Sequence, residues 1–156
     1  EMCIRDRLTV YTDSTMRIPI KTIRVSVGKA GTETPTGTWT MHRAGRWQEL
    51  MGPSWGQYGT HVVNGIFVHS VACGQANSYN LPVGEYLRLG NPASHGCIRA
   101  CVADAKWVWD NCNGSKIRIF DGTYTSNEAL KGPLGRKALT PLRGSKNFDP
   151  TDPACK

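Results

Sequence analysis

The alternation of apolar and polar residues predicts a chain built mainly of short β-strands. Residues 8–11 alternate in this way, and the β-branched residues of 17–27 predict two strand segments bent near Pro19. Gly, Pro and Thr in residues 28–37 predict a turn region, and strand character resumes at 39–41. A closing strand is predicted at 116–120.

The clearest local signal is a β-hairpin near the middle of the chain. Residues 57–63 and 66–70 flank the dipeptide Asn64-Gly65, which is the favoured pair for a two-residue type I′ turn. The neighbouring stretch 43–56 holds three Gly and a Pro, and 73–93 has Gly, Asn and Pro throughout, so we expect both to be loops.

One principal helix is predicted in the second half of the chain. Apolar residues recur there at helical spacing, at Ile98, Cys101, Val102, Ala105, Val108, Trp109 and Cys112. Asp104 lies near the start, where the helix dipole favours an acid, and Asn113-Gly114 supplies a stop. The expected fold class is therefore α+β, mostly β with one principal helix.

Length and charge narrow the possibilities further. A chain of 156 residues fits one domain with a hydrophobic core, and no apolar run approaches the roughly 18 residues of a spanning helix. The net charge of +7 favours anionic partners such as nucleic acid, acidic lipid or an acidic wall polymer, without choosing among them. Because the basic residues are scattered and not interleaved with aromatics, nucleic-acid binding is not expected.

Candidate chemistry gathers in the stretch Ser94-His95-Gly96-Cys97-Ile98-Arg99, at the start of the predicted helix. A thiolate is a strong nucleophile, but a free cysteine needs a nearby base at neutral pH. His69 ends a predicted strand, which is a rigid mount for such a base. Taken singly, Cys97 could equally be a buried structural cysteine, and His69 a half-buried histidine bonded to a carbonyl.

Together these residues resemble the signature of L,D-transpeptidase catalytic domains of the YkuD type. His69 is followed after 24 residues by the Ser94–Arg99 stretch, and Thr34-Pro35-Thr36-Gly37-Thr38-Trp39 resembles the second hallmark of the family. Further stretches, including Asp149-Pro150-Thr151-Asp152-Pro153, resemble its clostridial branch. The resemblance implies the β-sandwich-like fold of that family.

The resemblance also implies a role for each site residue. Cys97 would attack the carbonyl after the third residue of a peptidoglycan stem tetrapeptide, expelling D-Ala and leaving a thioester. His69 would be its base, oriented by the carbonyl of Ser70. Backbone N–H groups of His95, Gly96 and Cys97 would form the oxyanion hole.

The same resemblance implies that Ser94 and Arg99 help to hold the substrate, Arg99 standing where the family often has Asn. An amine of a neighbouring stem would resolve the thioester into a 3→3 cross-link. No metal or organic cofactor is implied, and carbapenems are expected to acylate Cys97. The long 70–93 gap suggests a loop over the cleft, and Trp47 and Trp55 form either an opposite wall or simple packing.

The alternatives are an L,D-carboxypeptidase, in which water resolves the same thioester, and a non-catalytic module that binds the cell wall. A zinc module is not expected, because four-ligand sites usually show two close pairs of ligands and this chain has no second pair. The resemblance implies an extracytoplasmic location at the cell wall.

Three segments are expected along the chain. Residues 1–7 match the translation of a sequencing-adapter end, so we interpret them as an artefact with the true start, and any signal or anchor, lost. Residues 8–122 would form the catalytic domain, and 123–156 an extended C-terminal tail.

The remaining cysteines suggest disulfides. Cys101 and Cys112, at the two ends of one helix, would lie about 16 Å apart, too far for a disulfide. Cys73 and Cys101 each follow a proposed catalytic residue by four positions, so Cys73–Cys101 is favoured and Cys112–Cys155 would be the second pair. Unpaired buried thiols are the alternative.

Overall fold

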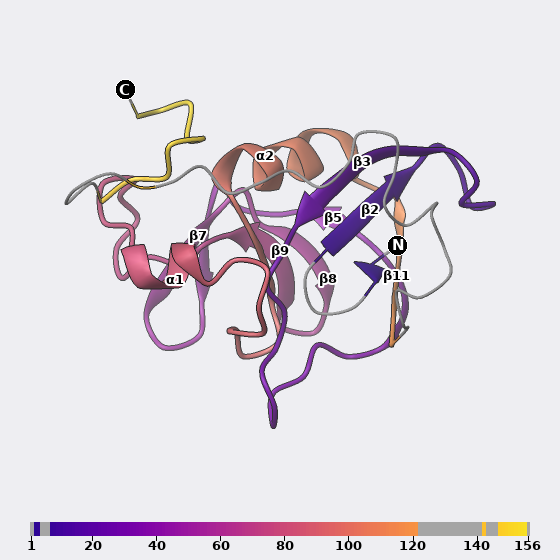
Figure 1. The fold of residues 1–156 in the computed structure, drawn as a ribbon, viewed down its shortest axis with the longest axis horizontal. Helices are drawn as coiled ribbons and strands as arrows, with labels where there is room; N and C mark the ends of the chain where they lie inside the picture. The colour runs from indigo at the N-terminus through magenta and orange to yellow at the C-terminus, as the bar shows by residue number, and fades with distance from the viewer. Residues whose placement is uncertain (1, 4–6, 122–141, 143–146, 156) are drawn as a thin grey trace.

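Two β-sheets and a separate hairpin form the framework of the protein (Figure 1). The computed structural model describes residues 2–3, 7–121, 142 and 147–155. In the larger sheet the strand order is β3-β2-β1-β11-β4, and in the second it is β10-β9-β8-β5. β6 and β7 pair only with each other among the described strands. This is the mostly β, sandwich-like fold that the sequence predicts.

The elements have the following bounds. The five-stranded sheet contains β1 (Met2–Cys3), β2 (Arg7–Tyr11), β3 (Pro19–Arg24), β4 (Gly37–Thr40) and β11 (Lys116–Phe120). The four-stranded sheet contains β5 (His42–Arg43), β8 (Thr60–Val63), β9 (Ile66–Ser70) and β10 (Ile98–Ala100). The hairpin is β6 (Trp47–Leu50) with β7 (Ser54–Gln57), and the helices are α1 (Val83–Leu87) and α2 (Val102–Asn111).

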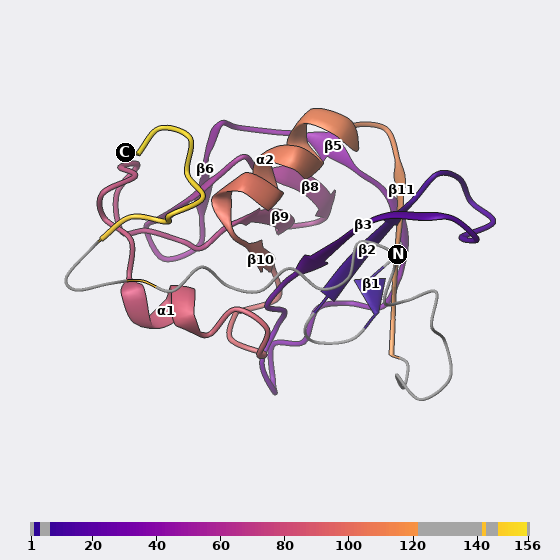
Figure 2. The ribbon, with the colours of Figure 1, turned by 45° about the horizontal axis from the view of Figure 1, so that its top comes forward.

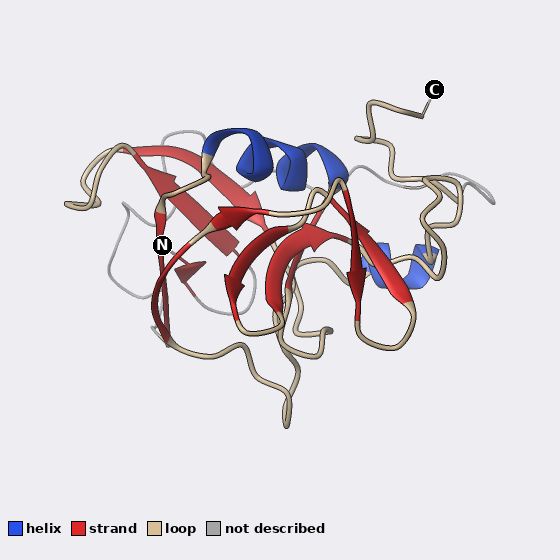
Figure 3. Cartoon of the chain, turned by 180° about the vertical axis from the view of Figure 1, so that it is seen from behind, coloured by secondary structure: helices blue, strands red, loops and turns tan. Residues whose placement is uncertain are grey.

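The principal helix, α2, lies across the strands and closes the core (Figures 2 and 3). It buries Val102, Ala105 and Val108 in the cluster that also holds Val68 of β9 and Ile117 of β11. Burial of apolar surface is the main force that holds these layers together. The core therefore joins the two sheets behind the face that carries the Cys97 stretch.

The predicted helix begins later than its apolar spacing suggests. Ile98–Ala100 is the strand β10, and α2 starts only at Val102. Ile98 and Ala100 are buried while Arg99 between them is not, which is the alternation of a strand. Over residues 98–100 the apolar spacing fits a helix as well as a strand, and pairing with β9 selects the strand.

The stretch 43–56 is not the loop predicted from its composition. Residues Trp47–Leu50 and Ser54–Gln57 pair as the antiparallel strands β6 and β7, and the stretch 73–93 contains the short helix α1. Likewise, 17–27 holds one strand, β3, where two segments were predicted. The glycine and proline residues of 43–56 indicate a loop, but the backbone hydrogen bonds that pair β6 with β7 do not depend on apolar side chains.

The hairpin at Asn64-Gly65 is confirmed, but not its turn type. Strands β8 and β9 pair on either side of the turn, with a register shift between His61 and Val63. Asn64 has a positive φ of 50°, and Gly65 is not among the residues with positive φ. A type I′ turn needs positive φ at both central positions, so the turn is not of this type, although Val63 and Ile66 still pair directly across its two residues.

The predicted disulfides are not formed: Cys73, Cys101, Cys112 and Cys155 are all free thiols. The Cys101 thiol donates a hydrogen bond to Asp104 Oδ2 at 3.1 Å, and the Cys73 thiol to the carbonyl of Val71 at 3.8 Å. Burial raises the pKa of Cys73 to about 11 and that of Cys101 to about 12. Cys73 and Cys101 are thus buried, protonated thiols.

Parts of the predicted terminal segments lie outside the described residues. These parts are 1 and 4–6 of the proposed artefact, and 122–141, 143–146 and 156 of the proposed tail region. Met2–Cys3 form β1, between β2 and β11. Within the described part of the chain, no helix has the length and apolar character needed to cross a membrane.

Candidate active site

Parallel pairing of β9 with β10 brings the two predicted catalytic residues to one place. Arg99 of β10 stands opposite His69 of β9, and Ile98 stands opposite Val68. Cys97 directly precedes β10. Because alternate residues of a strand share a face, Cys97 and Arg99 lie on the side of the sheet that carries His69. The register therefore brings together the predicted nucleophile, the predicted base and an arginine from distant segments of the chain.

His69 is held in one tautomer by its own backbone neighbour. The imidazole is 1% exposed, and its Nδ1 is hydrogen-bonded to the carbonyl oxygen of Ser70. A carbonyl can only accept, so Nδ1 carries the proton and Nε2 keeps a free lone pair. Burial, with a smaller contribution from the charge of Arg99, lowers the pKa of His69 to about 4, although the Ser70 hydrogen bond acts in the opposite direction. The ring is thus a neutral base at physiological pH.

Cys97 is a partly buried residue whose thiol contacts the turn of the β8–β9 hairpin. Its Sγ–H donates to the carbonyl of Gly65 at 3.5 Å. Burial raises the pKa of the Cys97 thiol, while the backbone at Phe67 and the charge of Arg99 act in the opposite direction. Because the His69 pKa falls and the Cys97 pKa rises, the resting pair is a neutral thiol with a neutral imidazole.

The loop before Cys97 is braced by the region of the second sequence hallmark. Thr34 Oγ1 donates to the carbonyl of Gly96 at 2.7 Å. The Ser94 carbonyl accepts from Thr32 Oγ1 at 3.1 Å and from the Lys29 N–H at 3.0 Å. These bonds join segments more than 60 positions apart in the sequence. The Thr-Pro-Thr-Gly hallmark thus has a direct physical role, because Thr34 fixes the backbone next to the nucleophile.

Within this loop the residues predicted to bind substrate or oxyanion are engaged in different ways. Ser94 is fully buried, and its hydroxyl donates to the Cys97 carbonyl at 2.6 Å and accepts from the Gly96 N–H at 3.1 Å. Gly96 has a φ of +121°, and a Cβ there would lie 2.8 Å from Ile66 Cδ1, so only glycine fits. The His95 side chain is exposed. Substrate contact by Ser94 remains a prediction.

Arg99 connects the site to the segment between β9 and β10. Its Nη1 donates to Glu85 Oε2 of α1 at 2.8 Å, and the Arg99 side chain is 14% exposed. Glu85 also accepts from Arg88 at 3.1 Å through its other oxygen. The Nε of Arg99 is buried and has no hydrogen-bond partner among the described residues. Arg99 thus anchors α1 beside the site, and its predicted contact with a substrate carboxylate remains a prediction.

The β6–β7 hairpin forms a wall against the base. A Cβ on Gly56 would lie 2.6 Å from His69 Nδ1 and 2.8 Å from its Cγ, so the backbone of β7 rests directly on the imidazole ring. Trp55 of the hairpin also pairs with Cys73, in the segment that follows β9, through two backbone hydrogen bonds of 2.7 and 2.8 Å. Trp47 and Trp55 are both half-buried on this hairpin, and a role for them as a cleft wall remains a prediction.

Sequence reasoning missed several residues that shape the site, among them Gly56, Gln57, Glu85 and Asp152. No local motif marks them, because each acts through a contact with a distant segment. The one available signal was the Asp-Pro-Thr-Asp-Pro stretch, whose two aspartates are both 2% exposed. Aspartates are almost never fully buried unless they are paired, so two buried aspartates in this segment imply contacts with the rest of the domain.

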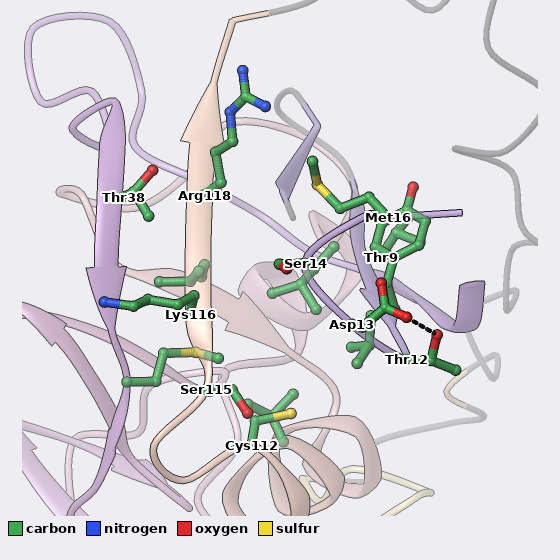
Figure 4. Close-up of a pocket in the computed structure, with 16 residues that line it drawn as sticks. Thr9, Thr12, Asp13, Ser14, Met16, Thr38, Cys112, Ser115, Lys116 and Arg118 are labelled. Carbon is green, nitrogen blue, oxygen red and sulfur yellow. Dashed lines mark hydrogen bonds between the residues drawn. The ribbon is translucent and has the colours of Figure 1, made fainter. Parts of the chain in front are cut away.

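A separate cavity of about 450 Å³ lies between β2 and β11, lined mainly by apolar side chains (Figure 4). None of His69, Cys97 and Arg99 lines it, so it is distinct from the candidate active site. Among the described residues, no group of three or more His, Cys, Asp or Glu side chains could hold a metal ion.

The site thus combines a thiol, a neutral imidazole and a guanidinium on a mostly β scaffold. The family model for the L,D-transpeptidase catalytic domain (YkuD) matches residues 4–134, and the chain belongs to this family. YciB, a protein of Bacillus subtilis (strain 168) whose name places it among the L,D-transpeptidases, is 59% identical over 27 residues. That match covers 17% of this chain and 14% of YciB.

Solved structures agree on the fold. An L,D-transpeptidase from Stackebrandtia nassauensis has a TM-score of 0.58 and 20% identity, covering 80% of this chain and 56% of its own. An L,D-transpeptidase from Mycobacterium smegmatis has a TM-score of 0.52 and 21% identity, covering 73% of this chain and 54% of its own. The chain therefore spans little more than half the length of either protein.

Proposed function

We propose that this domain is a peptidoglycan L,D-transpeptidase that forms 3→3 cross-links through a thioester on Cys97. The observation that carries the proposal is the strand register, which brings Cys97, one residue before β10, alongside β9, where the Nδ1 of His69 is bonded to the Ser70 carbonyl and its Nε2 is left basic. Membership of the family supports the same reaction class. An extracytoplasmic location at the cell wall follows from the proposed substrate.

The first half-reaction is acylation of the thiol. Sγ of Cys97 attacks the carbonyl carbon after the third stem residue while His69 Nε2 takes the thiol proton. The bond to the terminal D-Ala then breaks, and the proton passes from His69 to the leaving amine. Because the resting pair is neutral, His69 acts as a general base during the attack and no ion pair exists beforehand.

The developing oxyanion needs donors from the loop before β10. The Gly96 N–H already donates to Ser94 Oγ, so we assign the principal oxyanion contacts to the N–H groups of His95 and Cys97. In the second half-reaction an amine of a neighbouring stem attacks the thioester and gives a proton to His69; the C–S bond then breaks, and His69 returns this proton to the Cys97 sulfur. If water took the place of the amine, the enzyme would be an L,D-carboxypeptidase.

The test uses a disaccharide tetrapeptide with meso-diaminopimelate, followed by mass spectrometry beside Cys97→Ala. A dimer lighter by one D-Ala, absent with the variant, is the expected result. A monomeric tripeptide would identify a carboxypeptidase instead. Untouched substrate, together with no adduct of Cys97 after incubation with a carbapenem, would contradict an enzymatic role and favour a module that binds the cell wall.

A further inference from the structure

The C-terminal segment 147–155 contacts three elements that carry the candidate active site. Asp149 Oδ2 accepts from the Val102 N–H at 2.7 Å, and Thr151 Oγ1 accepts from the Ala103 N–H at 3.1 Å, so both cap the start of α2. The Asn147 carbonyl accepts from the N–H of Leu81, in the connection between β9 and β10, at 2.8 Å. Figures 1 and 2 show this segment on the side of the molecule that carries α1.

The third contact reaches the hairpin that covers the base. Asp152 is 2% exposed and Gln57 of β7 is 3% exposed. Gln57 Nε2 donates to Asp152 Oδ2 at 2.8 Å, while Asp152 Oδ1 accepts from the Ala154 N–H at 2.8 Å. The turn of the segment therefore orients the carboxylate toward Gln57. A buried hydrogen bond to a charged group is stronger and more directional than a neutral one.

Gln57 in turn touches the residues that set the orientation of His69. Its backbone N–H donates to Ser70 Oγ at 2.8 Å, and the Ser70 carbonyl is the acceptor for His69 Nδ1. The preceding residue, Gly56, rests against the imidazole ring. One backbone step of β7 thus contacts both the ring of the base and the residue that fixes its tautomer.

The way in which β7 is held makes the contact between Gln57 and Asp152 important. β6 and β7 form a two-stranded sheet of their own, so the ladders of the two larger sheets do not hold them. β7 is fixed by individual bonds to its surroundings, which include Gln57–Asp152, Gln57–Ser70 and Trp55–Cys73. A change at Asp152 would therefore be transmitted to the position of β7 over His69.

We propose that Gln57 and Asp152 are positioning residues for the base His69, so that the C-terminal segment is a working part of the catalytic domain. This inference rests on the proposed function only in taking His69 as the base for Cys97. Asp152 contacts neither His69 nor Cys97. It acts through Gln57 and the β7 backbone on the orientation of the imidazole.

Four variants separate positioning from simple support. Gln57→Glu opposes two carboxylates, and Gln57→Met removes the hydrogen bond without adding charge. The double variant Gln57→Glu with Asp152→Asn restores one carboxylate and one amide in exchanged places. Asp149→Asn is the matched control, because Asp149 is equally buried in the same segment but contacts α2 and not β7.

Two measurements are made on each folded variant, well below its Tm. The first is kcat and KM with the tetrapeptide. The second is the pH profile of alkylation by iodoacetamide, followed at Cys97 by peptide mass spectrometry, with His69→Gln as the reference for loss of the base. Alkylation needs no peptidoglycan substrate, so it reports on His69 even if the tetrapeptide is not turned over.

Both single Gln57 variants are expected to lower kcat roughly tenfold, with KM changed less than about twofold, and to move the alkylation profile toward that of His69→Gln. The double variant should recover most of both losses, while Asp149→Asn should lower Tm alone. The proposal is overturned if the double variant is no better than Gln57→Glu, or if Asp149→Asn changes both readouts as much as Gln57→Met. An unreactive tetrapeptide with the expected alkylation profiles would contradict the proposed substrate and leave the positioning role supported.

Discussion

The surroundings of Cys97 and the region between β2 and β11 are built in different ways. Around Cys97, hydrogen bonds join segments far apart in the chain, such as Thr34 to Gly96 and Asp152 to Gln57. Between β2 and β11, apolar side chains including Ile117 surround a cavity of about 450 Å³. Apolar burial is non-directional, whereas hydrogen bonds depend on angle and distance. The first region fixes geometry and the second mainly supplies stability, so substitutions in them should have separable effects.

The largest effect on activity is expected from a single methyl group at the base. In Gly56→Ala the new Cβ would meet His69 Nδ1 at 2.6 Å, so the imidazole or β7 must move. We expect kcat to fall about 100-fold, as displacements near 1 Å at a catalytic group can do. Gly84→Ala is the control, because a Cβ there has no atom within 4 Å. Equal activity of the two variants would contradict close packing of β7 on the base.

The opposite pattern is expected from Ile117→Ala in the β2–β11 region. Ile117 is 1% exposed, and its truncation would enlarge the existing cavity. The free energy of unfolding should fall by about 3 kcal/mol, with kcat unchanged within about twofold. Urea denaturation and the tetrapeptide assay measure the two quantities. A loss of kcat comparable to that of Gly56→Ala would show that the two regions are not separable.

His69 should also make stability depend on pH. Its pKa is 6.5 when unfolded and about 4 in the folded protein, so between these values the unfolded chain binds more protons. Stability from this group is complete above pH 6.5 and falls as the pH drops toward about 4, by roughly 3 kcal/mol in total. Carboxyl groups titrate in the same range, so the measurement is the difference in urea unfolding between the wild type and His69→Gln. A difference that stays constant across this range would contradict burial of a neutral imidazole.

A smaller effect is expected from Thr34→Val, which keeps the shape of the side chain but removes its hydroxyl. The Gly96 carbonyl would lose its donor and the Gly28 N–H its acceptor. We expect about 1–2 kcal/mol of destabilisation and roughly a tenfold loss of kcat, because the backbone beside Cys97 is released. Thr38→Val, at an exposed position on the cavity side, should change stability by less than about 0.5 kcal/mol and leave kcat unchanged. Similar kcat losses in the two variants would argue against a specific brace.

The sequence predicts those parts of the fold that have a local physical signal. The β11 strand at 116–120 and the hairpin at Asn64-Gly65 follow from alternation and turn chemistry, and both are present. The helix end at Asn113-Gly114 is also confirmed, with Gly114 at a φ of +81°. Ile98 was misassigned because its spacing fits a helix as well as a strand. Only the distant partner β9 selects the strand.

The motif residues of the site could be proposed from sequence, but the contacts that hold them could not. His69 and Cys97 belong to recognisable motifs, whereas Gly56 and Asp152 act through partners that are distant in the chain. The same limit explains the disulfide prediction. Equal spacing of Cys73 and Cys101 from the site residues suggested a bond, but their thiols are directed to Val71 and Asp104. Sequence spacing gives no side-chain direction.

The parallel pairing of β9 with β10 separates chemistry from specificity in this domain. The relative position of His69 and Cys97 is set by strand register, and not by the length of the connection between the strands. The exposed stretch 74–77 can therefore be lengthened or exchanged in protein engineering, provided that Cys73, Leu81 and Glu85 keep their contacts with Trp55, the C-terminal segment and Arg99. A new acceptor preference could be selected in that connection while the thiol and imidazole keep their places.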